Sequence, residues 1–246
     1  MPRGAPRISS IFLVVESAQD VREALCYSLL AFGIKGLPVA SRRDALAAVK
    51  AQDGIEGAVI DIDNKDVEGI QLINDLKAAE NSRRIAVIVH TIQSRKEFVR
   101  QMVEIGVAGY LLKPFSPEAT KAKLEAILSK LSTHNASRKH IRVSPDPDEL
   151  TRVSFRISGI KQLLSGRIVD VSLGGIAVDL FNPPADNPFT KGIPIPRLDF
   201  SLDGKALAPS GSVVIYKPRV LAVRFETMSA SDRQNLERYI FKRISS

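Results

Sequence analysis

Residues 11–16 are Ile-Phe-Leu-Val-Val-Glu, an apolar run of strand length that ends at a carboxylate. Similar apolar runs follow it, at 58–60, 85–89 and 109–112. Between the runs, as in 21–32, apolar residues recur at helical spacing. Buried strands that alternate with helices predict an α/β fold with a doubly wound parallel sheet that helices cover on both faces.

The pattern changes after Leu131. Residues 132–137 are small and polar, which is typical of a linker. Beyond them apolar and polar residues alternate, as in 153–158, and Asp203-Gly204 is a hairpin signal. These features predict an antiparallel β-barrel, closed by an amphipathic helix that Ser231 caps. The expected domains are therefore 8–131 and 138–246, joined by the linker.

Composition narrows the class of protein. The chain has 35 Lys and Arg against 27 Asp and Glu, a net charge of +8, and most of the excess follows residue 131. The second domain therefore suits an anionic partner. A single cysteine, Cys26, excludes an intramolecular disulfide and is expected in the core. No apolar run is long enough to span a bilayer, so we expect a cytoplasmic protein without membrane insertion.

Polar residues follow the predicted parallel strands where each one ends, namely Glu16, Asp61, Thr91 and Lys113. In a doubly wound sheet these positions meet at one edge, where functional groups collect. With the runs 12–16 and 109–115, and with Gly69 eight residues after Asp61, this half resembles the receiver domain of two-component response regulators. The resemblance implies that the doubly wound parallel sheet is five-stranded.

The resemblance implies a phosphoprotein with Asp61 as the phosphoacceptor and with a histidine kinase or another phosphodonor as partner. Thr91 and Lys113 would bind the transferred phosphoryl group. Glu16 and Asp61 would bind Mg²⁺ weakly, because the family's adjacent acidic pair is here Glu16-Ser17. Two alternatives stay open: a working receiver with low metal affinity, or a degenerate receiver kept for packing and partner contacts.

A second set of polar residues lies in the predicted barrel. Arg138 and Arg142 form an R-x-x-x-R pattern, and residues 170–175 form D-x-S-x-x-G. Arginine forks bind phosphate bidentately and match the O6/N7 edge of guanine. On a strand, Asp170 and Ser172 share a face, which turns Val169 and Val171 toward the core.

Together the two patterns resemble the PilZ domain, a receptor family for cyclic di-GMP. The resemblance implies that this nucleotide is bound by a set of five residues: Arg138, Arg142, Asp170, Ser172 and Gly175. Gly175 would let the backbone approach the ligand. We expect the segment 138–142 to be mobile without ligand and ordered by it.

The sequence as a whole predicts a bacterial signalling protein that binds cyclic di-GMP, with the receiver-like domain as input or interaction module and a downstream protein partner. The alternative is an adaptor with a non-phosphorylated receiver, acting by protein contacts independent of nucleotide. A DNA-binding regulator ranks last, because no recognition helix is predicted after residue 137. No nucleophile–base set appears in the second half, so an enzyme is not expected.

Overall fold

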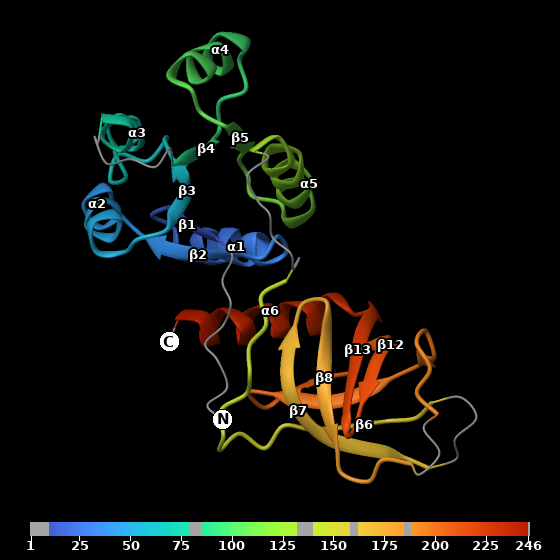
Figure 1. Cartoon of the computed structure of the whole chain (residues 1–246). Coiled ribbons are helices and arrows are strands. Elements are labelled where there is room, and N and C mark those ends of the chain that lie inside the picture. Colours follow the sequence, from blue (N-terminus) through green and yellow to red (C-terminus); the bar gives the residue numbers. More distant parts are fainter. Residues whose placement is uncertain (1–9, 79–84, 132–139, 158–161, 185–187, 246) are drawn as a thin grey trace. The chain divides into compact units, whose positions relative to one another are not determined.

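The computed structural model describes residues 10–78, 85–131, 140–157, 162–184 and 188–245. The chain forms two compact units that divide between residues 139 and 140 (Figure 1). The predicted linker, 132–137, lies outside the described residues. Within the described ranges, no helix has the length and apolar character needed to cross a membrane.

The first unit alternates strands and helices. Its elements are β1 (Ser10–Val15), α1 (Gln19–Leu30), β2 (Ile34–Val39), α2 (Arg42–Ala51), β3 (Ile55–Asp61), α3 (Gly69–Ala78), β4 (Ala86–Thr91), α4 (Lys96–Ile105), β5 (Gly109–Leu112), α5 (Pro117–Leu128) and a 3₁₀ turn, η1 (Ser129–Leu131). The strands pair in the order β2-β1-β3-β4-β5, all parallel. The predicted parallel five-stranded sheet is confirmed.

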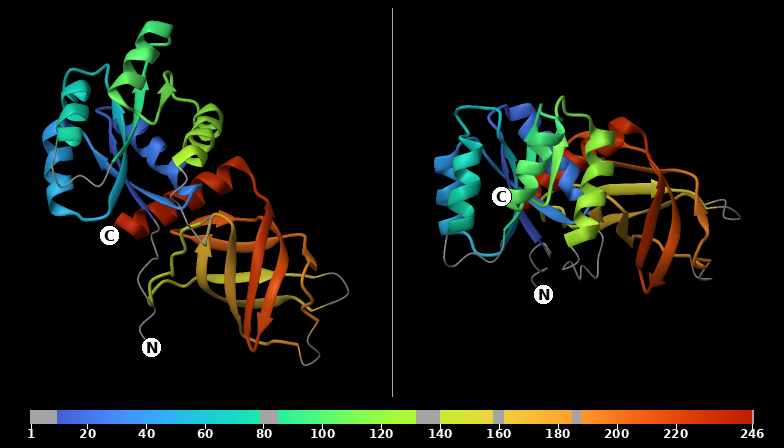
Figure 2. Two further views of the ribbon diagram at one scale, coloured as in Figure 1. Left: turned by 45° about the horizontal axis from the view of Figure 1, so that its top comes forward. Right: turned by 90° about the horizontal axis from the view of Figure 1, so that it is seen from above.

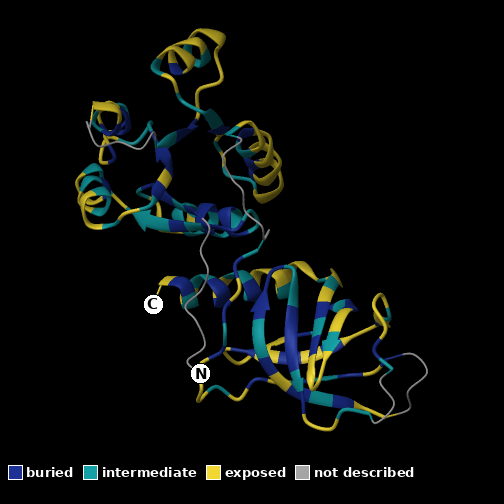
Figure 3. Cartoon of the chain, in the orientation of Figure 1, coloured by how far each residue is buried: buried dark blue, intermediate teal, exposed yellow. Residues whose placement is uncertain are grey.

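Helices cover both faces of this sheet. One face packs against α2, α3 and α4, with side chains such as Leu13, Ile60 and Met102 in a shared core. On the other face α1 packs against β1 and α5. The buried residues concentrate in the sheet and on the inward sides of the helices (Figure 3). Burial on both faces explains why these strands are apolar throughout.

Strand β2 has no clear sequence signal, because it contains Gly36 and Pro38. Proline removes a main-chain donor, so it is tolerated at a sheet edge, and β2 is an edge strand. Gly36 packs directly on α1: a Cβ there would lie 2.7 Å from the Cys26 Sγ. The weak apolar pattern of β2 therefore reflects its edge position and its close packing on α1.

The second unit is built from short antiparallel strands and one helix. Its elements are β6 (Arg152–Phe155), β7 (Leu164–Ser172), β8 (Gly175–Leu180), β9 (Pro194–Ile195), β10 (Leu198–Leu202), β11 (Lys205–Leu207), β12 (Ser210–Lys217), β13 (Val220–Thr227) and α6 (Ala230–Ser245). The strand order is β11-β10-β6-β7-β8-β13-β12-β9. The sheet curls on itself (Figure 2), which agrees with the predicted barrel and closing helix.

Two local expectations for this unit are wrong. Ser229, not Ser231, caps α6, because the Ser229 hydroxyl accepts from the Asp232 N–H at 3.0 Å. A β-bulge between Ile168 and Asp170 shifts the inward–outward alternation of β7. Ile168 and Val171 are therefore fully buried, whereas Val169 is only half-buried.

The hairpin signal at Asp203-Gly204 is confirmed. Both residues have positive φ, +46° and +73°, and they join β10 to β11. A turn with two positive φ angles matches the twist of the flanking strands, and it is most easily adopted by Asp or Asn followed by Gly. The turn thus fixes the register of this edge of the barrel.

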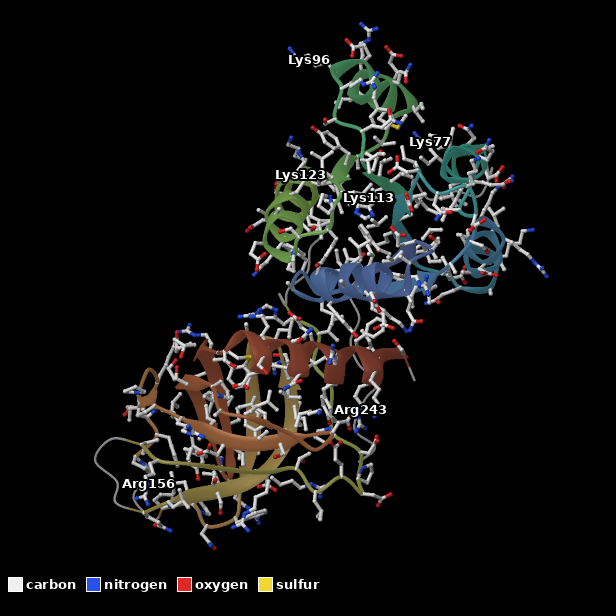
Figure 4. The ribbon with its side chains drawn as sticks, turned by 180° about the vertical axis from the view of Figure 1, so that it is seen from behind. Lys77, Lys96, Lys113, Lys123, Arg156 and Arg243 are labelled. Atoms are coloured by element: carbon white, nitrogen blue, oxygen red, sulfur yellow. The ribbon has the colours of Figure 1, made fainter. Side chains whose placement is uncertain are left out.

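Helix α6 also holds the segment that leads into the barrel. Arg243, labelled in Figure 4, pairs with the carboxylates of Asp146 and Glu149. The Tyr239 hydroxyl donates to Glu149 at 2.9 Å. The Arg243 and Glu149 side chains are only 13% and 19% exposed, so their contact is shielded from water and holds Glu149 against the helix.

The packing around Cys26 predicts its reactivity. Its side chain is fully buried, and burial raises the pKa of its thiol to about 12. Because the thiolate is the reactive form, Ellman's reagent at pH 8 should modify the native chain about a hundredfold more slowly than the chain in urea, or slower still. Rapid stoichiometric labelling of the native chain would contradict this packing.

Candidate functional site

The first candidate site surrounds Asp61, at the carboxyl ends of β1, β3, β4 and β5. The Asp61 side chain is 1% exposed, and its Oδ1 accepts from the Lys113 ammonium at 2.6 Å. Figure 4 shows Lys113 at the centre of this unit. The peptide bond between Lys113 and Pro114 is cis.

Gly69 is required by the backbone of the same site. A Cβ on Gly69 would lie 2.4 Å from the carbonyl oxygen of Asp61. Because no neighbouring backbone atom can give way so far, only glycine fits eight residues after Asp61. The close approach of α3 to the end of β3 therefore explains why glycine stands at this distance from Asp61.

Asp63 connects the other two groups of this site. Its Oδ1 accepts from the Thr91 hydroxyl at 2.8 Å, and its Oδ2 accepts from the Ile92 N–H at 2.7 Å. The Lys113 Nζ lies 3.5 Å from the same Oδ2. The structure thus brings Asp61, Thr91 and Lys113 together, with Asp63 between them.

Glu16 lies beside this network but is bound elsewhere. Its Oε2 lies 3.0 Å from the Nδ1 of His90 and its Oε1 accepts from the Ala18 N–H at 3.2 Å. Burial by itself raises the pKa of the Glu16 carboxyl, but these hydrogen bonds and the nearby Lys113 charge hold that pKa below its usual value. Glu16 is therefore a buried carboxylate whose two oxygens both have protein partners.

Lys113 is stabilised in its charged form. Partial burial lowers the pKa of its ammonium, whereas the hydrogen bond to Asp61 and the charges of the surrounding carboxylates raise it further, so the net shift is upward. The Lys113 ammonium is therefore positively charged at physiological pH, and it lies among three carboxylates, those of Glu16, Asp61 and Asp63.

The second candidate site lies where the segment before the barrel meets β7. Val143 exchanges two main-chain hydrogen bonds with Val171, each 2.9 Å. Both valines are buried, as is Ile141. The structure therefore packs residues 141–143 onto the barrel.

This pairing sets Arg142 beside Asp170. The Arg142 Nη1 lies 3.8 Å from the Asp170 Oδ1, and the two side chains are 53% and 29% exposed. At that distance and exposure the pair contributes little stability. Both groups therefore keep most of their hydrogen-bonding capacity for another partner. Arg138 lies outside the described residues.

Ser172 and the two glycines form the turn between β7 and β8. The Ser172 hydroxyl donates to the Gly175 carbonyl and accepts from the Gly174 N–H, both at 3.3 Å. Its side chain is buried. The Ser172 hydroxyl thus closes the turn.

Comparisons with known proteins agree with both halves of this picture. Residues 12–125 match the response regulator receiver domain, and residues 136–242 match the PilZ domain. The chain is a receiver domain followed by a PilZ domain.

The curated relatives match the receiver part. Chemotaxis protein CheY-3 of Vibrio cholerae is 30% identical over 87 residues, which cover 35% of this chain and 66% of the relative. The phosphate regulon transcriptional regulatory protein PhoB of Escherichia coli is 28% identical over 120 residues, 49% of this chain and 52% of PhoB. The solved structure of CheY4 of Vibrio cholerae is 22% identical, covering 48% of this chain and 98% of CheY4 with a TM-score of 0.43.

Sequence reasoning missed two residues of the receiver site. His90 is not among the predicted site residues, yet it is the buried partner of Glu16. Asp63 is not among the predicted site residues either, yet it accepts from the Thr91 hydroxyl and pairs with Lys113. The only available signals were a histidine within an apolar strand and a carboxylate two residues after Asp61.

The two consecutive glycines of the turn, Gly174 and Gly175, are each required for a different contact. A Cβ on Gly175 would lie 2.4 Å from the Val223 carbonyl oxygen, so Gly175 is required by packing against β13. A Cβ on Gly174 would lie 2.4 Å from the ring of His140. Gly174 is therefore the glycine whose missing side chain lets the arginine segment approach the motif.

The two glycines predict different costs of substitution. Gly175→Ala should lower the free energy of unfolding of the PilZ domain by about 1–3 kcal/mol, because the added methyl meets backbone that cannot move aside. Gly174→Ala should cost less, because it meets the end of a side chain. Urea unfolding followed by circular dichroism, with hydrogen exchange of β8 and β13, measures both. An equal or larger loss in Gly174→Ala would contradict the assignment.

Proposed function

We propose that this chain is a signalling protein that binds cyclic di-GMP through its PilZ domain, with the receiver domain as an input or interaction module. The observation that carries the proposal is the Val143–Val171 pairing. This pairing places the exposed Arg142 beside Asp170, the first residue of the D-x-S-x-x-G motif.

The chemistry of the two side chains suits the two parts of this ligand. The guanidinium of Arg142 is 53% exposed, and its fork fits a phosphate or the O6/N7 edge of guanine. Asp170 can accept hydrogen bonds from the N–H groups of guanine. The ligand would replace the long contact between the two side chains with closer, charge-assisted ones.

The remaining predicted residues complete the proposed site. Ser172 and Gly175 would act by holding the turn in shape, as their contacts in the barrel suggest. Arg138 would be the second arginine, reaching the ligand from the start of the segment. Neither domain type is catalytic, and the proposal includes no enzymatic activity.

The role of the receiver domain has two versions. In one, a histidine kinase or another phosphodonor transfers a phosphoryl group to Asp61. In the other, the domain acts as an adaptor that contacts a downstream protein partner without being phosphorylated. Both versions place the chain in the cytoplasm, where the nucleotide and such partners occur. Glu16 and Thr91 already have hydrogen-bond partners within the domain, His90 and Asp63, which favours the second version.

Calorimetric titration tests the nucleotide site. Cyclic di-GMP should bind the wild-type chain, and Arg142→Ala should weaken binding by about 2 kcal/mol, or about thirtyfold, because a charge-assisted contact is lost. Arg197→Ala is the matched control, since Arg197 pairs with Asp199 on the same barrel outside the motif. Absence of binding to the wild type, or equal losses in both variants, would contradict the proposed site.

A further inference from the structure

Asp63 gathers the kinds of donors that bind a phosphoryl group. A hydroxyl from Thr91 and the main-chain N–H of Ile92 each donate to one of its oxygens, at 2.8 and 2.7 Å. The ammonium of Lys113 lies 3.5 Å away. A phosphoryl group on an aspartate is stabilised by the same combination of hydroxyl, amide and ammonium. Here a carboxylate of the chain already accepts from the hydroxyl and the amide, and the ammonium lies at ion-pair distance from it.

The residues around Asp61 do not fit the Mg²⁺ that the family resemblance implies. This ion needs near-octahedral oxygen coordination, with carboxylates that draw it from water. Both Glu16 oxygens are bound by His90 and by the Ala18 N–H. Ser17 stands in the place of the second acid, and its hydroxyl accepts from the Asn64 side chain at 2.6 Å. Among the described residues, no group of three His, Cys, Asp or Glu side chains is arranged to hold a metal.

We propose that the Asp63 carboxylate takes the place of the phosphoryl group in this receiver domain. It holds the Thr91 hydroxyl and the start of the β4–α4 connection in position without phosphorylation. Asp61 stays unmodified for two reasons: its metal site is incomplete, and the donors that would stabilise the transferred group are occupied. A second anionic group on Asp61 would also meet the Asp63 charge. This inference is independent of nucleotide binding by the PilZ domain.

The consequence for signalling is a receiver with a fixed output surface. In a switching receiver, the hydroxyl gains its anionic partner only when phosphorylation occurs. In this chain the partner is covalently built in, two residues from the acceptor. The domain would therefore present one conformation of the Ile92–Arg95 segment to a protein partner, regardless of the supply of phosphodonor.

Acetyl phosphate with Mg²⁺, followed by intact mass, tests the proposal on the full chain. In the reaction at issue, an Asp61 oxygen forms a bond to phosphorus while the bond from phosphorus to acetate breaks. The wild type should remain unmodified. The double variant Ser17→Asp with Asp63→Asn, which supplies the acid and frees the donors, should gain one phosphoryl group, and adding Asp61→Asn should abolish the gain.

Hydrogen exchange supplies an independent readout of the positioning role. Asp63→Ala should raise the exchange rate of the Ile92 N–H about tenfold, because its charged acceptor is lost. Asp66→Ala is the matched control, as Asp66 is an exposed carboxylate of the same loop. Phosphorylation of wild-type Asp61, a folded double variant that stays unmodified, or unchanged exchange in Asp63→Ala would each overturn the proposal.

Discussion

Two main-chain hydrogen bonds between Val143 and Val171 fix the geometry on which the proposed nucleotide site depends. Both valines point into the core, so their neighbours Arg142 and Asp170 lie on the opposite, outward face. The bulge before Asp170 turns Val171 inward and Asp170 outward. The missing side chain of Gly174 leaves room for the His140 ring. The Arg243 contacts on α6 hold the chain just after this segment. An exposed arginine is thereby held in place by buried, apolar neighbours.

The two domains use their polar groups in opposite ways. In the PilZ domain, Arg142 and Asp170 are partly exposed and only weakly paired, so they are available to a ligand. In the receiver domain, Glu16 and Asp61 are almost fully buried, and both Glu16 oxygens and the Asp61 Oδ1 already have hydrogen-bond partners within the protein. Satisfied buried groups favour a single arrangement, because breaking any contact leaves an unpaired charge. The physical contrast fits a ligand-responsive second domain and an unresponsive first one.

The fold class of both domains could be predicted from the sequence, because it follows from the spacing of apolar residues and the order of strands and helices along the chain. The grouping of Asp61, Thr91 and Lys113 could also be predicted, because each residue lies at the end of a predicted parallel strand. Other features depend on contacts between distant residues. The pairing of His90 with Glu16 joins residues 74 positions apart, and the tolerance of Pro38 depends on β2 lying at an edge. The bulge in β7 breaks the period of two that placed Val169 in the core. The roles of Gly174 and Gly175 depend on what lies over each Cβ position.

Hydrogen exchange of the full chain, with and without saturating cyclic di-GMP, tests the central claim most directly. The account predicts slower exchange in two segments that are distant in sequence but paired in space, 141–143 and 170–175, while β10 and β11 of the same barrel stay unchanged. Protection confined to other parts of the chain, or no protection at saturation, would contradict a nucleotide site formed by the arginine segment and the D-x-S-x-x-G turn.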